Sequence, residues 1–103
     1  MSAWAPADDT DYPGDTVAYT GTAGTTDAAW AKGPSKVLVT CTTAAYVKVV
    51  DASDGVATTA SQMVPANTPI ALAVPPSYQA FWVSAVQVAS GGNAYAKPGE
   101  LVP

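Results

Sequence analysis

Short runs rich in β-branched residues, separated by turn-forming residues, constrain the fold of this 103-residue chain most strongly. Valine and threonine favour strands, whereas Gly, Pro, Asn and Asp favour turns. Strands this short, at such regular spacing, are typical of a small antiparallel β-sandwich or an open barrel. The sequence therefore predicts an all-β fold. The expected strands cover 36–42, 45–50, 58–64, 70–74, 79–88 and 93–97.

The turns between these runs are marked by their residues. Asp and Gly at 51–55 and prolines at 65–69 and 75–77 end three of the expected strands. Ser90-Gly91-Gly92-Asn93 predicts a short hairpin loop. Because proline has no N–H to give to a ladder, Pro98 is expected to end the last strand.

Residues 1–34 differ in composition from residues 35–103. They hold five of the eight acidic residues and several Gly and Thr, with one short possible strand at 16–20. A segment this polar cannot bury enough surface to order itself alone. We expect an extended N-terminal arm that lies on another surface, followed by a β-sandwich domain at 35–103. A floppy leader is the alternative. The arm carries four widely spaced aromatic residues, Trp4, Tyr12, Tyr19 and Trp30.

The residue types that are missing exclude several classes of function. The chain has no His, no Arg and one Cys, so it offers no His-activated nucleophile, no imidazole metal ligand and no internal disulfide. Four Lys and a net charge of −4 do not favour binding to nucleic acid. We therefore expect no enzyme activity and no cofactor or metal. Prolines interrupt the longest uncharged stretch and the first residues lack a signal-peptide pattern, so no membrane partner is expected.

The core is thin and the strand edges lack charge. Ala, Val and Thr supply 46 residues, and the 42 residues from Gly55 to Ala96 contain no charged side chain. Small domains with weak cores usually need staples or partners, and monomers usually protect their strand edges with charge. Oligomerisation or docking is therefore expected. The alternative is that the N-terminal arm of the same chain covers the edges.

Four further features have both a structural and a functional interpretation. The acidic run at 8–15 fails the pattern of a calcium loop and is expected to be solvated or to face a basic partner. Cys41 is expected to be a small buried residue, with an intermolecular disulfide as the alternative. Asp51 and Asp54 are expected to shape a turn rather than to catalyse. Trp82, with Phe81, Tyr78 and Tyr95, forms either a ligand platform or part of the core or an interface.

Eight short segments follow one another in this order: VLVT (37–40), AYVKV (45–49), ATTA (57–60), VPANTP (64–69), VPP (74–76), VSAVQ (83–87), ASGGNAY (89–95) and EL (100–101). Over residues 36–101 this order resembles the small β-sandwich proteins encoded among the structural genes of tailed bacteriophages. The sequence departs from their pattern at Pro75-Pro76-Ser77, where glycine is usual, and at Pro98 in the last strand. Members of this family are virion components, often capsid decoration (cement) proteins or head-fibre bases, and the family has no catalytic residues to transfer.

The resemblance implies a decoration protein on the outside of a phage head. It is expected to be made in the host cytoplasm, to bind the major capsid protein and to form a homo-oligomer, with a trimer favoured. Aromatic residues dominate interface energies, so the candidate partner-binding residues are aromatic. A carbohydrate-binding module that uses the Trp82 face is the alternative from another class, and a tail or neck protein is a third. The candidate partner-binding residues are Trp4, Tyr12, Tyr19, Trp30 and Trp82.

Overall fold

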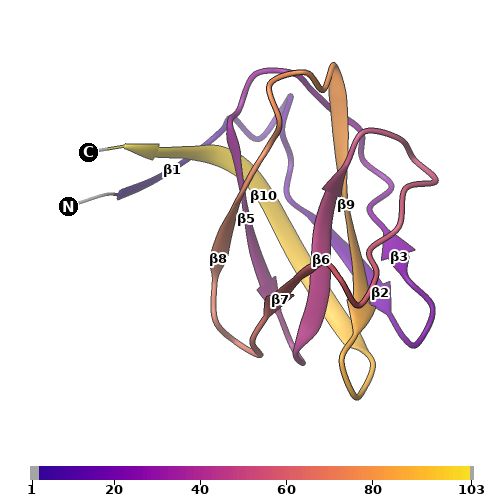
Figure 1. Ribbon diagram of the computed structural model, residues 1–103. Coiled ribbons are helices and arrows are strands. Elements are labelled where there is room, and N and C mark those ends of the chain that lie inside the picture. The colour runs from indigo at the N-terminus through magenta and orange to yellow at the C-terminus, as the bar shows by residue number, and fades with distance from the viewer. Residues whose placement is uncertain (1–2, 103) are drawn as a thin grey trace.

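The chain folds as two antiparallel sheets packed face to face, as a computed structural model that describes residues 3–102 shows (Figure 1). The predicted sandwich is confirmed, and the sheets do not close into a barrel. The first sheet has the order β1-β10-β5-β8, with β2 also on β10, and the second has the order β3-β9-β6-β7, with β4 also on β9. The first sheet contains β1 (Ala3–Pro6), β2 (Asp15–Tyr19), β5 (Lys36–Cys41), β8 (Ile70–Ala73) and β10 (Gly92–Val102). The second contains β3 (Gly24–Thr25), β4 (Trp30–Ala31), β6 (Ala45–Val50), β7 (Gln62–Val64) and β9 (Ala80–Gln87).

The core lies between the sheets and follows the alternation of the strands. Val37, Val39 and Cys41 of β5 are buried, while the residues between them are partly exposed. Successive strand residues face opposite sides of a sheet, so one face of each strand supplies the core. The free thiol of Cys41 is buried, as expected for a small core residue, and burial raises its pKa.

The short connections β5–β6 and β9–β10 pass from one sheet to the other. The predicted hairpin at 90–93 is therefore wrong, since β9 and β10 belong to different sheets. The two connections are tied together, because the Thr43 hydroxyl donates to the Ser90 carbonyl at 3.1 Å and the Tyr19 hydroxyl donates to the Thr43 carbonyl at 2.6 Å. A connection of three or four residues specifies a reversal of the chain, but it does not specify whether the next strand pairs with the previous one.

The predicted boundary at residue 34/35 is not present in the structure. β1 and β2 pair with β10, and β3 and β4 pair with β9, so the expected arm supplies four strands of the sandwich. The segment orders because it is hydrogen-bonded to strands from the other end of the chain, which its own composition cannot reveal. The alternative expectation is that the N-terminal segment of the same chain covers the strand edges. It agrees with the structure, because β2 pairs along β10 and β3 and β4 pair along β9.

The last strand runs through Pro98 and does not end there. The Pro98 carbonyl accepts a hydrogen bond from the Ala7 N–H at 3.0 Å. Because the N and C=O of one strand residue point to the same side, the ring nitrogen also points away from β5. The ring nitrogen of Pro98 faces the gap between the residues of β10 that pair with β1 and those that pair with β2. No ladder hydrogen bond requires an N–H at this point. The proline therefore fits inside β10.

The part of the chain that the structure describes contains no helix long and apolar enough to cross a membrane.

Candidate functional site: a projecting terminal ribbon

The two ends of the described chain form a two-stranded ribbon that leaves the sandwich. β1 pairs with the last residues of β10 in the register Ala3↔Val102 to Pro6↔Gly99. In Figure 1 this ribbon extends away from the body, with the N- and C-terminal ends side by side at its tip. The pairing partner of β10 on its other side, β5, begins opposite Gly99, so residues 100–102 have a strand on one side only.

The ribbon presents apolar side chains outside the core. Leu101 is 46% exposed and Val102 is 39% exposed, and Trp4 is half-buried. Trp4 lies opposite Leu101, and directly opposed residues share a face, so both lie on one face of the ribbon. The Trp4 ring passes over Gly99, because a Cβ added to Gly99 would lie 2.7 Å from Trp4 Cζ2. A tryptophan and a leucine therefore form an apolar face that projects from the molecule.

A groove of about 440 Å³ runs under the ribbon, where it joins the body; we call it the terminal groove. Its apolar wall includes Ala5 and Val102 from the ribbon and Tyr12 and Pro34 from the body. The ribbon thus offers an apolar face above and an apolar concavity below.

Two polar clamps hold the base of the ribbon. The Glu100 carboxylate accepts hydrogen bonds from the Ser35 N–H and the Ser35 hydroxyl, both at 2.5 Å. These bonds, and the charge of Lys36, lower the pKa of Glu100. The direction of the ribbon is therefore fixed where it leaves the first sheet.

The second clamp fixes the loop between β1 and β2. The buried ammonium of Lys97 donates to Asp9 Oδ1 at 2.8 Å and to the Tyr12 carbonyl at 2.7 Å. The hydrogen bond and the charge of Lys97 lower the pKa of Asp9, whose side chain is exposed. This loop carries most of the acidic run, and its Asp8 carboxylate accepts from the Asp11 N–H at 2.8 Å in a local turn. No group of three His, Cys, Asp or Glu that could hold a metal is formed within residues 3–102.

The five predicted partner-binding residues separate into two groups. Trp4 lies on the ribbon, Tyr12 lines the terminal groove, and Trp82 is half-buried on the outer face of the second sheet. Tyr19 and Trp30 are 2% and 0% exposed, so their prediction as partner anchors is wrong. Both are core residues, because the segment that carries them is built into the sheets.

Trp82 does not form an aromatic platform with its predicted neighbours. Phe81 points into the core and packs against Trp30 in a tilted arrangement with ring centroids 5.6 Å apart, and Tyr78 packs partly against the core. Tyr95 is on the other sheet. The alternation predicted for Phe81 and Trp82 is confirmed, but the four rings do not gather on one face.

Sequence reasoning missed Leu101 and Val102 as members of this site. The apolar pair Leu101-Val102 is a usable signal in the sequence. It can be interpreted only when β10 is known to continue past Pro98. The pairing of β1 with β10 joins residues almost a full chain length apart, and no local pattern encodes it.

Comparison of the chain with protein-family models, with curated proteins and with solved structures finds no match.

Proposed function

We propose that this protein is a structural component of a phage virion, a capsid decoration (cement) protein that binds the outer surface of the head. The apolar terminal ribbon carries the proposal, because it extends beyond the sandwich and leaves Leu101 and Val102 exposed on a projecting element. The resemblance of residues 36–101 to small phage β-sandwich proteins supports the same role. The proposed role requires no catalytic group, because the function is the binding of this protein to the shell.

The ribbon is suited to bridging neighbouring subunits of a shell. Trp4 and Leu101 supply apolar area at its tip, and aromatic residues commonly contribute much of the binding energy in interfaces. Residues 100–102 also have a free edge to which a strand of the major capsid protein can be added. A trimer of sandwiches, favoured by the resemblance, would place three ribbons on one patch of shell.

Stabilisation of the shell then follows from mass action. A contact that exists only in the assembled shell favours the assembled state, since binding to one state alone shifts the equilibrium toward it. Several ribbons on one oligomer raise the effective concentration of each, so weak contacts combine.

The proposal is tested by adding the purified protein to capsids of the phage that encodes it, after those capsids have been stripped of accessory proteins. We expect saturable binding, a copy number comparable to that of the major capsid protein, and a higher temperature of shell disruption. Trp4→Ala and removal of residues 1–6 should weaken binding, while circular dichroism confirms that the sandwich remains folded. Asp54→Ala, in the exposed turn after β6 and outside the lining of the terminal groove, is the control.

Three results would count against the proposal: no binding to the capsid, a few copies located at a neck or tail, or binding that is unchanged when the ribbon is removed. The second would reassign the protein to another part of the virion, and the third would show that another surface carries the contact.

A further inference from the structure

A second open edge lies on the other side of the sandwich, where β7 covers only the first half of β6. β7 pairs with residues 45–47 and leaves Lys48, Val49 and Val50 without a strand on that side. β7 begins only at Gln62, because the residues before it form a turn. The Ser61 N–H donates to the Thr58 carbonyl at 2.9 Å, and the Thr58 N–H donates to Ser61 Oγ at 3.0 Å.

The backbone of Val49 is the part of this edge that can take another strand. The Val88 N–H donates to the Ala44 carbonyl, so Ala45↔Gln87 is a non-hydrogen-bonded pair of the β6–β9 ladder. Such pairs alternate with hydrogen-bonded ones, which makes Val49↔Val83 non-hydrogen-bonded as well. The N–H and C=O of Val49 therefore point away from β9, and neither has a hydrogen-bond partner within residues 3–102.

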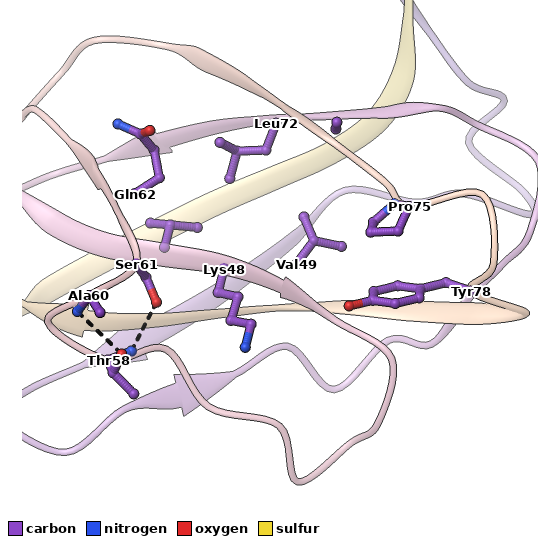
Figure 2. A pocket seen from close by; sticks show the side chains of 11 residues that line it. Lys48, Val49, Thr58, Ala60, Ser61, Gln62, Leu72, Pro75 and Tyr78 are labelled. Carbon is purple, nitrogen blue, oxygen red and sulfur yellow. Dashed lines mark hydrogen bonds between the residues drawn. The ribbon is translucent and has the colours of Figure 1, made fainter.

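This edge opens into a groove of about 460 Å³, which we call the edge groove (Figure 2). It lies between β6 and the edge strand β8 of the other sheet, with Thr58 and Ser61 in one wall and Tyr78 in another. Figure 2 shows Val49 and Lys48 on opposite sides of β6, with Leu72 on the same side as Val49. An extended chain in this place would present one face to apolar side chains and the other to Lys48.

Lys48 is the one charged residue that lines the edge groove in the described structure, and it forms no ion pair within residues 3–102. A residue directly opposite Lys48 on an added strand would share its face and lie within reach of its ammonium. A carboxylate there has the complementary charge. The residue opposite Val49 would point toward Leu72, where an apolar side chain fits.

We propose that the edge groove is a β-augmentation site for an extended peptide segment of a partner protein, which pairs with the Val49 backbone and places an apolar residue followed by an acidic residue opposite Val49 and Lys48. The order apolar then acidic follows from antiparallel pairing, the direction that β7 already has. Main-chain bonds supply affinity in this recognition mode and the side-chain pockets supply specificity. The site is independent of the terminal ribbon and of the virion role.

The test uses the full chain, labelled with ¹⁵N, and the capped peptide acetyl-Thr-Thr-Val-Glu-amide. We expect saturable chemical-shift changes at the amides of Val49 and Leu72, and slower hydrogen exchange at the Val49 amide. A peptide with Lys in place of Glu should bind about fivefold more weakly, since it places like charges opposite each other. Lys48→Glu should reverse the order of the two peptides, and Lys32→Glu, the same charge change outside the edge groove, should leave it unchanged.

Each other outcome overturns the proposal. Absence of shift changes at Val49, or changes confined to another surface, would show that the edge does not accept a strand. Equal binding of both peptides by wild type and by Lys48→Glu would remove the role of Lys48. Concentration-dependent shifts at Val49 in the absence of peptide would assign the edge groove to a second copy of this chain.

Discussion

Burial separates two tryptophans that have similar surroundings in the sequence. Trp30 and Trp4 both lie among Ala and Pro in the first third of the chain. Trp30 is fully buried, and its indole N–H donates to the Pro13 carbonyl at 2.9 Å, whereas Trp4 lies on the projecting ribbon. The same residue type therefore supports folding at one position and is available for contact at the other.

We expect Trp30→Ala to lower the free energy of unfolding by about 3–5 kcal/mol, the usual cost of removing a large aromatic side chain from a core. Urea denaturation followed by circular dichroism measures this change. Trp4→Ala is the matched control, and its cost should be much smaller because its ring lies outside the sandwich. Similar losses for the two variants would contradict the assignment of Trp30 to the core.

The ion pair between Lys97 and Asp9 should make part of the stability depend on pH. The pKa of Asp9 is lower in the folded chain than in the unfolded chain, so the pair stabilises the fold above the unfolded pKa. That contribution is lost as the pH falls through the folded pKa, below about pH 4. In urea titrations, Asp9→Asn should be less stable than wild type at neutral pH, and the difference should shrink at acidic pH. A difference that stays constant down to the acid limit would show that Asp9 acts without its charge.

At the scale of the element, the terminal ribbon depends on a close approach that glycine permits. A Cβ on Gly99 would lie 2.5 Å from the Ala5 carbonyl oxygen as well as against the Trp4 ring. Since β1 pairs only with the end of β10, the rest of the sandwich does not depend on this contact.

We therefore expect Gly99→Ala to release β1 while the body stays folded. Hydrogen exchange should speed up at the Ala5 and Glu100 amides, which face each other across a hydrogen-bonded pair of the β1–β10 ladder, and stay slow at Val39 and Val83. Gly21→Ala is the control, because a Cβ there would lie 3.6 Å from its nearest neighbour, the Gln87 side chain. Unchanged exchange in β1 would mean that the ribbon tolerates a side chain at this point.

The sequence was sufficient to predict the strands that are rich in β-branched residues or whose residues alternate between buried and exposed. These are β5, β6, β8 and β9, and their positions match the predicted runs within a residue or two. β1, β3 and β4 were not predicted, since two to four residues carry no period and their order comes from β9 and β10. The candidate site was predicted only in part, because Trp4 and Tyr12 are visible as aromatic residues but the free edges are properties of pairing between distant segments.

At the scale of the whole molecule, the first third of the chain is part of the fold rather than an attachment to it. Val17, Tyr19 and Trp30 belong to the core, and they are separated by many residues from the β-strands they contact. Such non-local pairing also predicts slow folding for a chain of this length.

We expect a chain that begins at residue 32 to lack a cooperative fold, since it loses β2, β3, β4 and the largest core side chain. Its amide NMR spectrum should show narrow dispersion, and its thermal transition should be absent. A chain that begins at residue 7 should keep both properties of the full protein, because it loses only the ribbon strand. A folded sandwich from residue 32 onward would restore the predicted boundary at 34/35.

The adjacency of Ala3 and Val102 also determines how the molecule responds to force. A load applied between these two residues acts across the ladder and opens the pairs of β1 and β10 one after another, as in unzipping. A load that enters through the ribbon and leaves through the body acts along the strands and strains many hydrogen bonds at once. The same ribbon is thus compliant when its ends are pulled apart and stiff when it serves as a tether for the body.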